Sequence, residues 1–211
     1  MAPPYSTKHF GNYTLNAQFP LDKEFVLIPI KAFSDAKKRL DPALSHDRRI
    51  TLVQEMASQV FTAAAPLPIA VICDTTVVAD WARDRGALVI WETGRGLDSA
   101  VEQGVGLLGS LGVSNVTVAH SDLPIASSLN ELGSFDGVTL VPDRRNDGTN
   151  VIRVHVDYGF RFSYGIGSFN RHLRECRRLR LPTRVLRVPS LTLDIDLPED
   201  LHRLDEVKSK S

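Results

Sequence analysis

From Glu24 onward the chain alternates short apolar runs with stretches of helical periodicity, and this alternation is what most limits its possible folds. The runs are rich in β-branched residues, which is typical of buried strands. They are EFVLIPI (24–30), PIAVIC (68–73), ALVIW (87–91), NVTVA (115–119), GVTLV (137–141), the extended piece NVIRVHV (150–156) and RVLRV (184–188). Strands that alternate with helices predict an α/β fold with a mostly parallel sheet and helices on both faces.

The segments between these runs have the spacing of amphipathic helices. One helical face, which Ser45 is placed to cap, consists of Ile50, Val53, Ala57, Val60, Phe61 and Ala64. Further helices are expected through Val78, Trp81 and Ala82, from Leu97 to Leu108, briefly after Pro124, near Ser168, and from Pro198 with Glu199 and Asp200 in its first turn. We therefore predict a single domain over residues 24–211, preceded by an irregular leader over residues 1–23.

Composition and charge limit the kinds of binding partner that we expect for this chain. Lys plus Arg and Asp plus Glu both number 25, so no net charge attracts nucleic acid or an anionic membrane. The longest apolar run, TAAAPLPIAVIC, contains two prolines and is too short to span a bilayer. Cys73 and Cys176 lie far apart, and no secretory signal pattern is visible. We expect a cytoplasmic protein with free thiols and no nucleic-acid or membrane partner.

Asp122 stands just after the strand NVTVA, two residues beyond His120. Ligands of an open α/β sheet bind outside the carboxyl ends of its strands, so this acid is a candidate ligand of a metal ion that holds a nucleotide phosphate. Asp194 and Asp196 end another run, LTLDID, and could add the carboxylates that Mg²⁺ takes. Either of them could instead be a helix N-cap, and His120 is expected to hydrogen-bond within its loop.

The loop PIKAFSDAKKRL follows the first strand and is basic. Lys31, Lys37, Lys38 and Arg39 lie where cations could bind a triphosphate over the binding crevice. A solvated, lysine-rich helix start is the equally weighted alternative. The loop contains no glycine, which excludes a P-loop.

Glycine also marks two other segments. In TGRGLDSA (93–100), Gly94 and Gly96 open a helix, and backbone without side chains can approach a base or sugar closely. A plain turn is the alternative there. The pattern GVGLLG (104–109) precedes a strand instead of following one, so we interpret its glycines as helix C-terminal residues and not as a dinucleotide site.

The segments VPDRRNDGTN (141–150) and YGIGSFNRH (164–172) suggest an anion site. Gly165, Gly167 and Ser168 at a predicted helix start, with Thr149 and Asn150 nearby, could form a nest of N–H groups and hydroxyls. Ser168 could also be a simple N-cap.

The helix that follows carries further basic residues. Arg171 and His172, one turn in, are in reach of the same anion. The later arginines are expected to form a solvated face; they are Arg174, Arg177, Arg178 and Arg180.

Six segments in this order resemble the 2-phospho-L-lactate guanylyltransferase family of coenzyme F-420 biosynthesis. They are LIPIKAFSDAKKRLDPALS, GRGLDSA, SDLPI, VPDRRNDGTN, YGIGSFNRHL and LDIDLPEDL, and together they cover Phe25 to Leu204. The resemblance implies the nucleotide-diphospho-sugar transferase (GT-A-like) fold. It also implies transfer of GMP from GTP to the phosphate of 2-phospho-L-lactate, phosphoenolpyruvate or 3-phosphoglycerate, with release of pyrophosphate.

The resemblance also implies roles for individual residues. Asp122 and Asp194 would hold Mg²⁺, while Gly96 and Asp98 would lie near the guanine nucleoside. Catalytic candidates that act on the GTP phosphates are Lys31, Lys37, Arg39 and Asp122. Residues implied or inferred to hold the acceptor are Thr149, Asn150, Gly165, Gly167, Ser168 and His172.

Three positions depart from the family pattern. His120 replaces an additional acid, Asp98 replaces an asparagine, and Ile166 replaces a frequent proline. The change at His120 affects the site of a second metal ion. Asp98 adds a charge near the nucleotide, and Ile166 affects the stiffness of the acceptor loop.

The expected reaction needs no general base. A phosphate monoester has a second pKa of about 6, so its oxygen is already an anion at neutral pH. Alternatives are a nucleotide-binding homologue without catalysis and a nucleotidyltransferase with another acceptor, such as a sugar phosphate or a pterin phosphate. The oligomeric state stays open, with a homodimer as one alternative.

Overall fold

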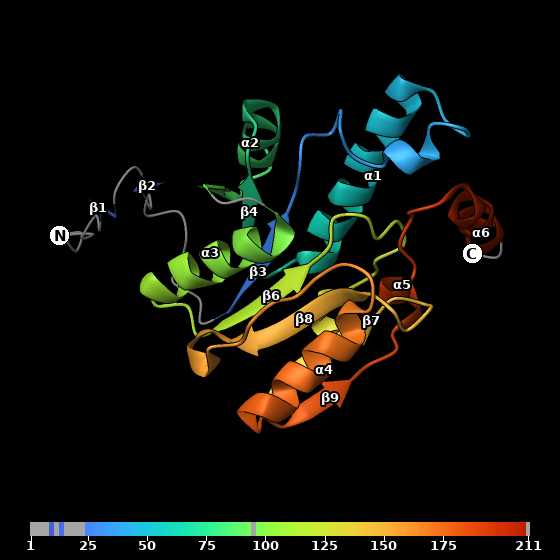
Figure 1. Cartoon of the computed structure of the whole chain (residues 1–211). Coiled ribbons are helices and arrows are strands. Elements are labelled where there is room, and N and C mark those ends of the chain that lie inside the picture. Colours follow the sequence, from blue (N-terminus) through green and yellow to red (C-terminus); the bar gives the residue numbers. More distant parts are fainter. Residues whose placement is uncertain (1–8, 11–12, 15–23, 94–95, 210–211) are drawn as a thin grey trace.

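The computed structural model describes residues 9–10, 13–14, 24–93 and 96–209 of the chain. These residues form a seven-stranded sheet of order β5-β4-β3-β6-β8-β7-β9 (Figure 1). Its strands are β3 (Glu24–Pro29), β4 (Ile69–Cys73), β5 (Leu88–Trp91), β6 (Asn115–Ala119), β7 (Val138–Pro142), β8 (Thr149–His155) and β9 (Thr183–Val185). Within this sheet β8 alone runs antiparallel to its neighbours, which confirms the mostly parallel sheet.

Of the predicted leader, residues 1–23, the structure describes two short strands. β1 (His9–Phe10) and β2 (Tyr13–Thr14) pair antiparallel with each other. The rest of that prediction lies outside the described residues.

The helices follow the predicted segments, with small differences. The α-helices are α1 (His46–Ala64), α2 (Thr76–Arg83), α3 (Leu97–Ser110), α4 (Ser168–Leu179), α5 (Pro189–Thr192) and α6 (Pro198–Lys208). The 3-10 turns are η1 (Lys38–Leu40), η2 (Leu129–Leu132) and η3 (Val156–Tyr158). The segment after Pro124 is thus a 3-10 turn. β9 ends at Val185 and not at Val188, and Pro189 opens the unpredicted helix α5. None of the described helices combines the length and the apolar character that crossing a membrane requires.

The sheet is buried on both faces, and alternate residues of each strand define the two cores. Val26 and Ile28 of β3 pack with α1 and α2, whereas Phe25 and Leu27 pack with α3 and α4. Full burial of such a side chain stabilises the fold by about 2 kcal/mol. The strand period thus places helices on both faces, as the sequence predicts.

The start of α1 agrees with the sequence pattern. The Ser45 hydroxyl accepts a hydrogen bond from the Arg48 amide at 3.4 Å and caps the helix. The predicted apolar face is the buried one, with Val53, Ala57 and Val60 in the core.

The two cysteines lie on opposite faces of the sheet as free, buried thiols. Cys73 ends β4 and Cys176 lies on α4, which confirms the prediction of unpaired thiols. Burial raises the pKa of Cys73 to about 11, so this thiol stays protonated at neutral pH.

The order of the strands creates a topological switch point. The chain passes from β3 outward to β4 and β5, then returns to β6 on the other side of β3. The loops that leave the carboxyl ends of β3 and β6 therefore diverge from neighbouring strands. Ligands of open α/β sheets bind at this kind of crevice.

Gly104 lies in the middle of α3 and not at its end, so the interpretation of GVGLLG as C-terminal glycines is wrong for this residue. A Cβ at Gly104 would lie 2.6 Å from Leu27 Cδ2, whereas a Cβ at Gly106 on the same helix would meet nothing within 4 Å. Gly104 therefore lets α3 approach β3 closely.

We expect the two glycines to respond differently to alanine. Gly106→Ala should raise the free energy of unfolding by about 1 kcal/mol, because alanine favours the helix. Gly104→Ala should lose that gain and be at least about 1 kcal/mol less stable than Gly106→Ala, because its methyl group overpacks Leu27. Urea denaturation of both variants measures the difference; equal stabilisation would contradict the close packing.

Candidate active site

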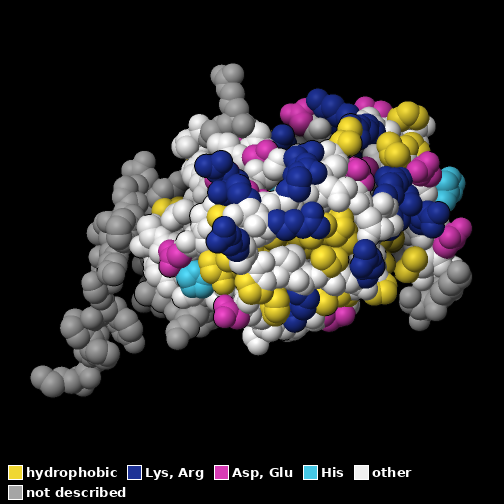
Figure 2. Space-filling view, turned by 60° about the horizontal axis from the view of Figure 1, so that its bottom comes forward, with side chains coloured by type: hydrophobic (Ala, Val, Ile, Leu, Met, Phe, Trp, Pro, Cys, Tyr) yellow, Lys and Arg dark blue, Asp and Glu magenta, His cyan; other side chains and the backbone are white. Residues whose placement is uncertain are grey.

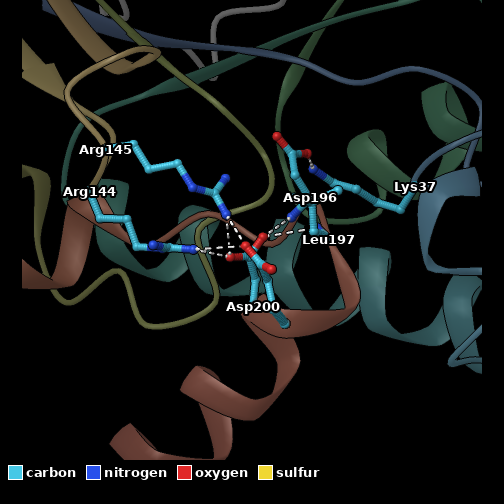
Figure 3. Close-up of polar contacts among 7 residues, drawn as sticks. Lys37, Arg144, Arg145, Asp196, Leu197 and Asp200 are labelled. Atoms are coloured by element: carbon cyan, nitrogen blue, oxygen red, sulfur yellow. Dashed lines mark hydrogen bonds and ion pairs between the residues drawn. The ribbon is translucent and has the colours of Figure 1, made fainter.

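Lys37 connects the loop after β3 with two aspartates. Its backbone is left-handed (φ 57°, ψ 35°) just before η1. Its ammonium donates to Asp122 Oδ2. It also donates to Asp196 Oδ1 at 2.5 Å (Figure 3). Burial alone would lower the pKa of Lys37, but the two carboxylates raise it above its ordinary value. Lys37 is therefore a cation held by two acids.

Asp122 lies in the loop after β6 and is ionised. Burial alone would raise the pKa of Asp122, but the Lys37 ammonium holds it below its usual range. Its Oδ1 atom is buried and accepts no hydrogen bond from the described residues. The buried Nε2 atom of the nearby, half-buried His120 also lacks a partner there. Unpartnered buried polar atoms are costly, so a bound cation or hydrogen-bonding group at these two atoms would be stabilising.

Asp194 joins this cluster from a distant segment. Ile195 N donates to Asp122 O at 3.4 Å, so the segment that contains Asp194 and Asp196 runs beside the loop after β6. Burial, together with Asp122 and Asp196, raises the pKa of Asp194 to about 7. Leu197 is the N-cap of α6, so neither aspartate has the alternative role of a cap.

These acids suit a hard divalent cation. Carboxylate oxygens are the protein ligands that Mg²⁺ takes, usually one or two of them together with substrate phosphates. Among the described residues no three His, Cys, Asp or Glu side chains already surround a metal position, because Lys37 lies between Asp122 and Asp196. The Oδ1 atom of Asp122 nevertheless leaves a carboxylate oxygen open to a cation, and burial together with the neighbouring acids raises the pKa of Asp194. The donor set fits Mg²⁺.

Asp200 holds the acidic segment in place, a role that the sequence did not reveal. Its Oδ2 atom accepts from the amides of Asp196 at 3.0 Å and Leu197 at 2.9 Å. Its Oδ1 atom accepts from Arg144 Nη2 at 2.5 Å and Arg145 Nη2 at 3.2 Å (Figure 3). The available signal was an acid at the third position of a helix that begins with proline, which predicts the backbone half of this arrangement.

The rest of the basic loop faces an open pocket of about 320 Å³, which is lined by Lys37, Lys38, Arg39 and Asp196. Arg39 is exposed, and Lys38 pairs with the exposed Asp35 at 2.7 Å. Of these cations Lys37 alone contacts the acidic cluster, while the others border the space beside it.

Arg49 on α1 anchors the basic loop and was not predicted. This buried guanidinium donates through Nη1 to the carbonyls of Ser34 at 3.0 Å and Ala36 at 2.5 Å. It also forms an ion pair with Asp41 at 2.8 Å. The core of the protein thus determines the course of the loop that carries Lys37.

Lys31 is exposed and lies near Glu92, which directly follows β5. Burial and Asp74 raise the pKa of Glu92, and the nearby Lys31 partly offsets this. Lys31 and Lys37 belong to the same predicted basic loop but have different acidic neighbours.

The predicted acceptor loop is stabilised from within by Arg171. Its guanidinium donates to Ser163 Oγ at 2.8 Å, to the Tyr164 carbonyl at 2.7 Å and to the Ile166 carbonyl at 2.5 Å. Because these donors are used inside the protein, Arg171 shapes the loop and does not reach outward to an anion as the sequence suggested.

The start of α4 is also internally bonded. Gly167, in the left-handed region at φ 72°, is the N-cap, so Ser168 is not a cap but the first helical residue. The Gly167 amide donates to Asp147 Oδ2 at 3.0 Å, and the Ser168 amide donates to the Gly165 carbonyl at 2.9 Å. The carboxylate of Asp147 thus takes one of the donors that the sequence assigned to a substrate anion.

Thr149, Asn150 and His172 form the wall behind this loop. His172 is fully buried; its Nε2 atom accepts from the Ser163 amide at 3.0 Å, so Nδ1 carries the proton toward Thr149 Oγ1, also at 3.0 Å. Asn150 Nδ2 donates to the Leu191 carbonyl at 2.9 Å. Direct contact of these side chains with an acceptor stays a prediction, and their visible role is to support the loop.

Asp98 links the start of α3 to the acceptor loop. Its Oδ1 atom accepts from the Tyr164 amide at 2.6 Å. Gly96, at φ 94°, is the N-cap of α3, while the neighbouring Gly94 and Arg95 lie outside the described residues. The structure therefore brings the predicted nucleoside segment and the predicted acceptor segment into contact.

The outer face of α4 is basic. Figure 2 shows Lys and Arg side chains scattered among hydrophobic ones on the side of the molecule that it brings forward. The exposed arginines of α4 and its C-cap are Arg174, Arg177, Arg178 and Arg180, which confirms a solvated face.

The fold is shared with solved nucleotide-handling enzymes. A Desulfovibrio desulfuricans G20 protein described as a nucleotide-diphospho-sugar transferase has a TM-score of 0.71 at 17% identity, covering 90% of this chain and 89% of that one. 4-Diphosphocytidyl-2C-methyl-D-erythritol synthase has a TM-score of 0.59 at 12% identity, covering 87% of this chain and 97% of that one. The fold class is that of the nucleotide-diphospho-sugar transferases, as predicted.

Sequence comparison gives the family. Residues 24–205 match the family described as guanylyl transferase CofC like. The phosphoenolpyruvate guanylyltransferase of Sphaerobacter thermophilus is 35% identical over 188 residues, 84% of this chain and 90% of that protein. The 2-phospho-L-lactate guanylyltransferase of Archaeoglobus fulgidus is 31% identical over 182 residues, which cover 85% of this chain and 82% of that protein. The chain belongs to this guanylyl transferase family and is an enzyme of the nucleotidyltransferase type.

The buried His172 predicts a pH dependence of stability. Burial, with a contribution from Arg171, lowers the pKa of His172 from 6.5 to about 4. The unfolded chain therefore binds a proton below pH 6.5 that the folded chain takes up only near pH 4, so stability falls as the pH falls through this window. Lowering the pH from 7 to 5 should therefore reduce the unfolding free energy by about 2 kcal/mol through His172 alone.

Urea denaturation of the wild type and of His172→Gln at both pH values measures this contribution. Between pH 7 and pH 5 the unfolding free energy of the variant should fall by about 2 kcal/mol less than that of the wild type. His202→Gln, at an exposed position on α6, should retain the pH dependence of the wild type. An unchanged pH dependence in His172→Gln would contradict the buried neutral imidazole.

Proposed function

We propose that the enzyme transfers GMP from GTP to a phosphate oxygen of a small phosphorylated carboxylic acid and releases pyrophosphate. One observation carries this proposal: Lys37 converges with Asp122, Asp194 and Asp196 at the topological switch point of the sheet. The relatives named phosphoenolpyruvate guanylyltransferase and 2-phospho-L-lactate guanylyltransferase support an acceptor of this class.

The acidic cluster is the proposed metal and triphosphate end of the site. Asp122 and Asp194 would hold Mg²⁺, with Asp196 beside them. The bound ion would supply charge neutralisation to the triphosphate as the α-phosphorus is attacked. Lys37, Lys38 and Arg39 line the adjoining pocket and would bind phosphate oxygens there. Lys31 is placed to act farther along the same sheet edge.

The acceptor end needs binding and orientation more than proton transfer. The acceptor's phosphate is already largely a dianion at neutral pH, so an oxygen lone pair forms the new bond to the α-phosphorus while the bond to the β-phosphate breaks. In this proposal the loop Gly165–Ser168 binds the acceptor, and Gly96 and Asp98 lie near the nucleoside. The contact between Asp98 and Tyr164 supports a shared boundary between the two substrates.

Pyrophosphate release from GTP and Mg²⁺ tests the function. The assay is run with phosphoenolpyruvate, 2-phospho-L-lactate, 3-phosphoglycerate and a sugar phosphate in turn. We expect release with one of the three phosphoacids, and Asp122→Asn should abolish it. Asp80→Asn, an exposed acid on α2, should retain full activity. Release with the sugar phosphate alone would change the acceptor class, and no release with any acceptor would favour a nucleotide-binding protein without catalysis.

Lys37 should compete with the metal ion in the absence of nucleotide. Its ammonium occupies one oxygen each of Asp122 and Asp196, so Lys37→Met should bind Mn²⁺ roughly tenfold more tightly than the wild type. The same change should raise the KM for GTP, because a phosphate-binding cation is lost. Electron paramagnetic resonance of free Mn²⁺ measures the first effect and initial rates measure the second.

Lys38→Met is the matched control, because Lys38 pairs with the exposed Asp35 and should leave Mn²⁺ binding unchanged. Weaker Mn²⁺ binding in Lys37→Met would show that Lys37 organises the acids instead of competing for them.

A further inference from the structure

We infer that Asp200 and Arg144 are positioning residues that hold the acidic segment in its metal-binding arrangement and tie it to the acceptor loop. This inference rests on the proposed function, because it assigns a purpose to contacts around the proposed metal site. Neither side chain would contact substrate; both would act through Asp194 and Asp196.

The carboxylate of Asp200 is fully used inside the protein. Its side chain is 1% exposed, and its two oxygens accept four hydrogen bonds (Figure 3). Burial alone would raise the pKa of Asp200, but the Arg144 guanidinium and the two amides hold it below its usual range. The group is therefore a buried anion that is satisfied by charge and by hydrogen bonds, a combination that fixes its surroundings.

The hydrogen bonds that Asp200 accepts from backbone amides hold the segment that contains Asp194 and Asp196. Asp200 binds the amides of Asp196 and Leu197, so the peptide that carries Asp196 cannot rotate without breaking these bonds. On the other side of the same residue, the Asp196 carboxylate meets Lys37. Asp194 precedes this fixed peptide by two residues, and Ile195 between them donates to Asp122.

The hydrogen bond from Arg144 connects Asp200 to the loop between β7 and β8. Arg144 donates to Asp200, and its own amide donates to the Thr192 carbonyl at 2.9 Å. In the same loop Asp143 accepts from the amides of Asp147 and Gly148, both at 2.9 Å.

Asp147 completes the connection, because its Oδ2 atom accepts from Gly167 N. Hydrogen bonds thus connect Asp196 to Asp200 and Arg144, the peptide bond connects Arg144 to Asp143, and hydrogen bonds continue from Asp143 through Asp147 to Gly167 of the acceptor segment.

A plain helix cap would not explain these contacts. An acid in the first helical turn needs backbone amides alone, and such acids are usually exposed. Asp200 is buried and also binds two guanidinium groups, while Asp205 on the same helix is exposed. The additional arginine contacts serve the relative placement of two segments that approach the site from different parts of the chain.

The test uses the full-length enzyme and the variant Asp200→Asn, with Asp205→Asn as the matched control. Asparagine keeps the size of the side chain but cannot accept from both the amides and the arginines. Mn²⁺ binding in the presence of GTP is measured by electron paramagnetic resonance, and the KM values for Mg²⁺ and for the acceptor by initial rates. Circular dichroism shows which variants are folded at the assay temperature.

We expect Asp200→Asn to weaken Mn²⁺ binding at least about 10-fold, because the segment that carries Asp194 would lose the bonds that hold it in place. The KM for the acceptor should rise with it, while Asp205→Asn stays within twofold of the wild type. Arg144→Lys, which keeps the charge but loses the fork, should show the same pattern more weakly than Asp200→Asn, with Arg203→Lys on the exposed side of α6 as its control. Arg144→Lys also supplies the test if Asp200→Asn does not fold.

Folded Asp200→Asn or Arg144→Lys protein with unchanged Mn²⁺ binding would overturn the positioning role while wild-type activity stands. If the wild type neither binds Mn²⁺ with GTP nor releases pyrophosphate, the proposed function itself fails. The two failures are therefore distinguishable.

Discussion

A single ammonium among three carboxylates is the interaction on which the site depends. Lys37 contacts Asp122 and Asp196. Burial, together with these two acids, raises the pKa of Asp194 to about 7. Bringing like charges together out of water is costly, and one cation does not balance three acids. The protein thus maintains a site that is deficient in positive charge, which suits a divalent ion that arrives with an anionic nucleotide.

The fold meets this cost with rigid supports on each side of the cluster. The loop that carries Lys37 is bound to α1 through Arg49, and the segment that carries Asp194 and Asp196 is bound to the β7–β8 loop through Asp200. The acceptor loop is likewise preorganised, because Arg171 takes up its carbonyls. Some side chains that the sequence suggests for substrate binding thus serve to hold the conformation of the loop.

Much of the fold could be predicted because burial on both faces leaves a periodic signal. The strand runs, the Ser45 cap and the placement of Asp122 after β6 all follow from local pattern. The contact of Asp200 with Arg144 could not be predicted, since it joins segments 56 residues apart and depends on which loops meet. For the same reason the sequence presented His172 as a possible anion ligand, whereas tertiary packing buries it. Gly104 shows a further limit: spacing does not distinguish a helix end from a close packing contact.

The proposed function requires that Asp122 and Asp194 hold one divalent ion beside the GTP phosphates. Anomalous diffraction from crystals grown with Mn²⁺ and a non-hydrolysable GTP analogue tests it most directly. We expect an anomalous peak within about 2.2 Å of a carboxylate oxygen from each aspartate, with the Lys37 ammonium displaced toward the phosphates. A peak away from both aspartates, or a bound nucleotide with Lys37 still between Asp122 and Asp196, would contradict it.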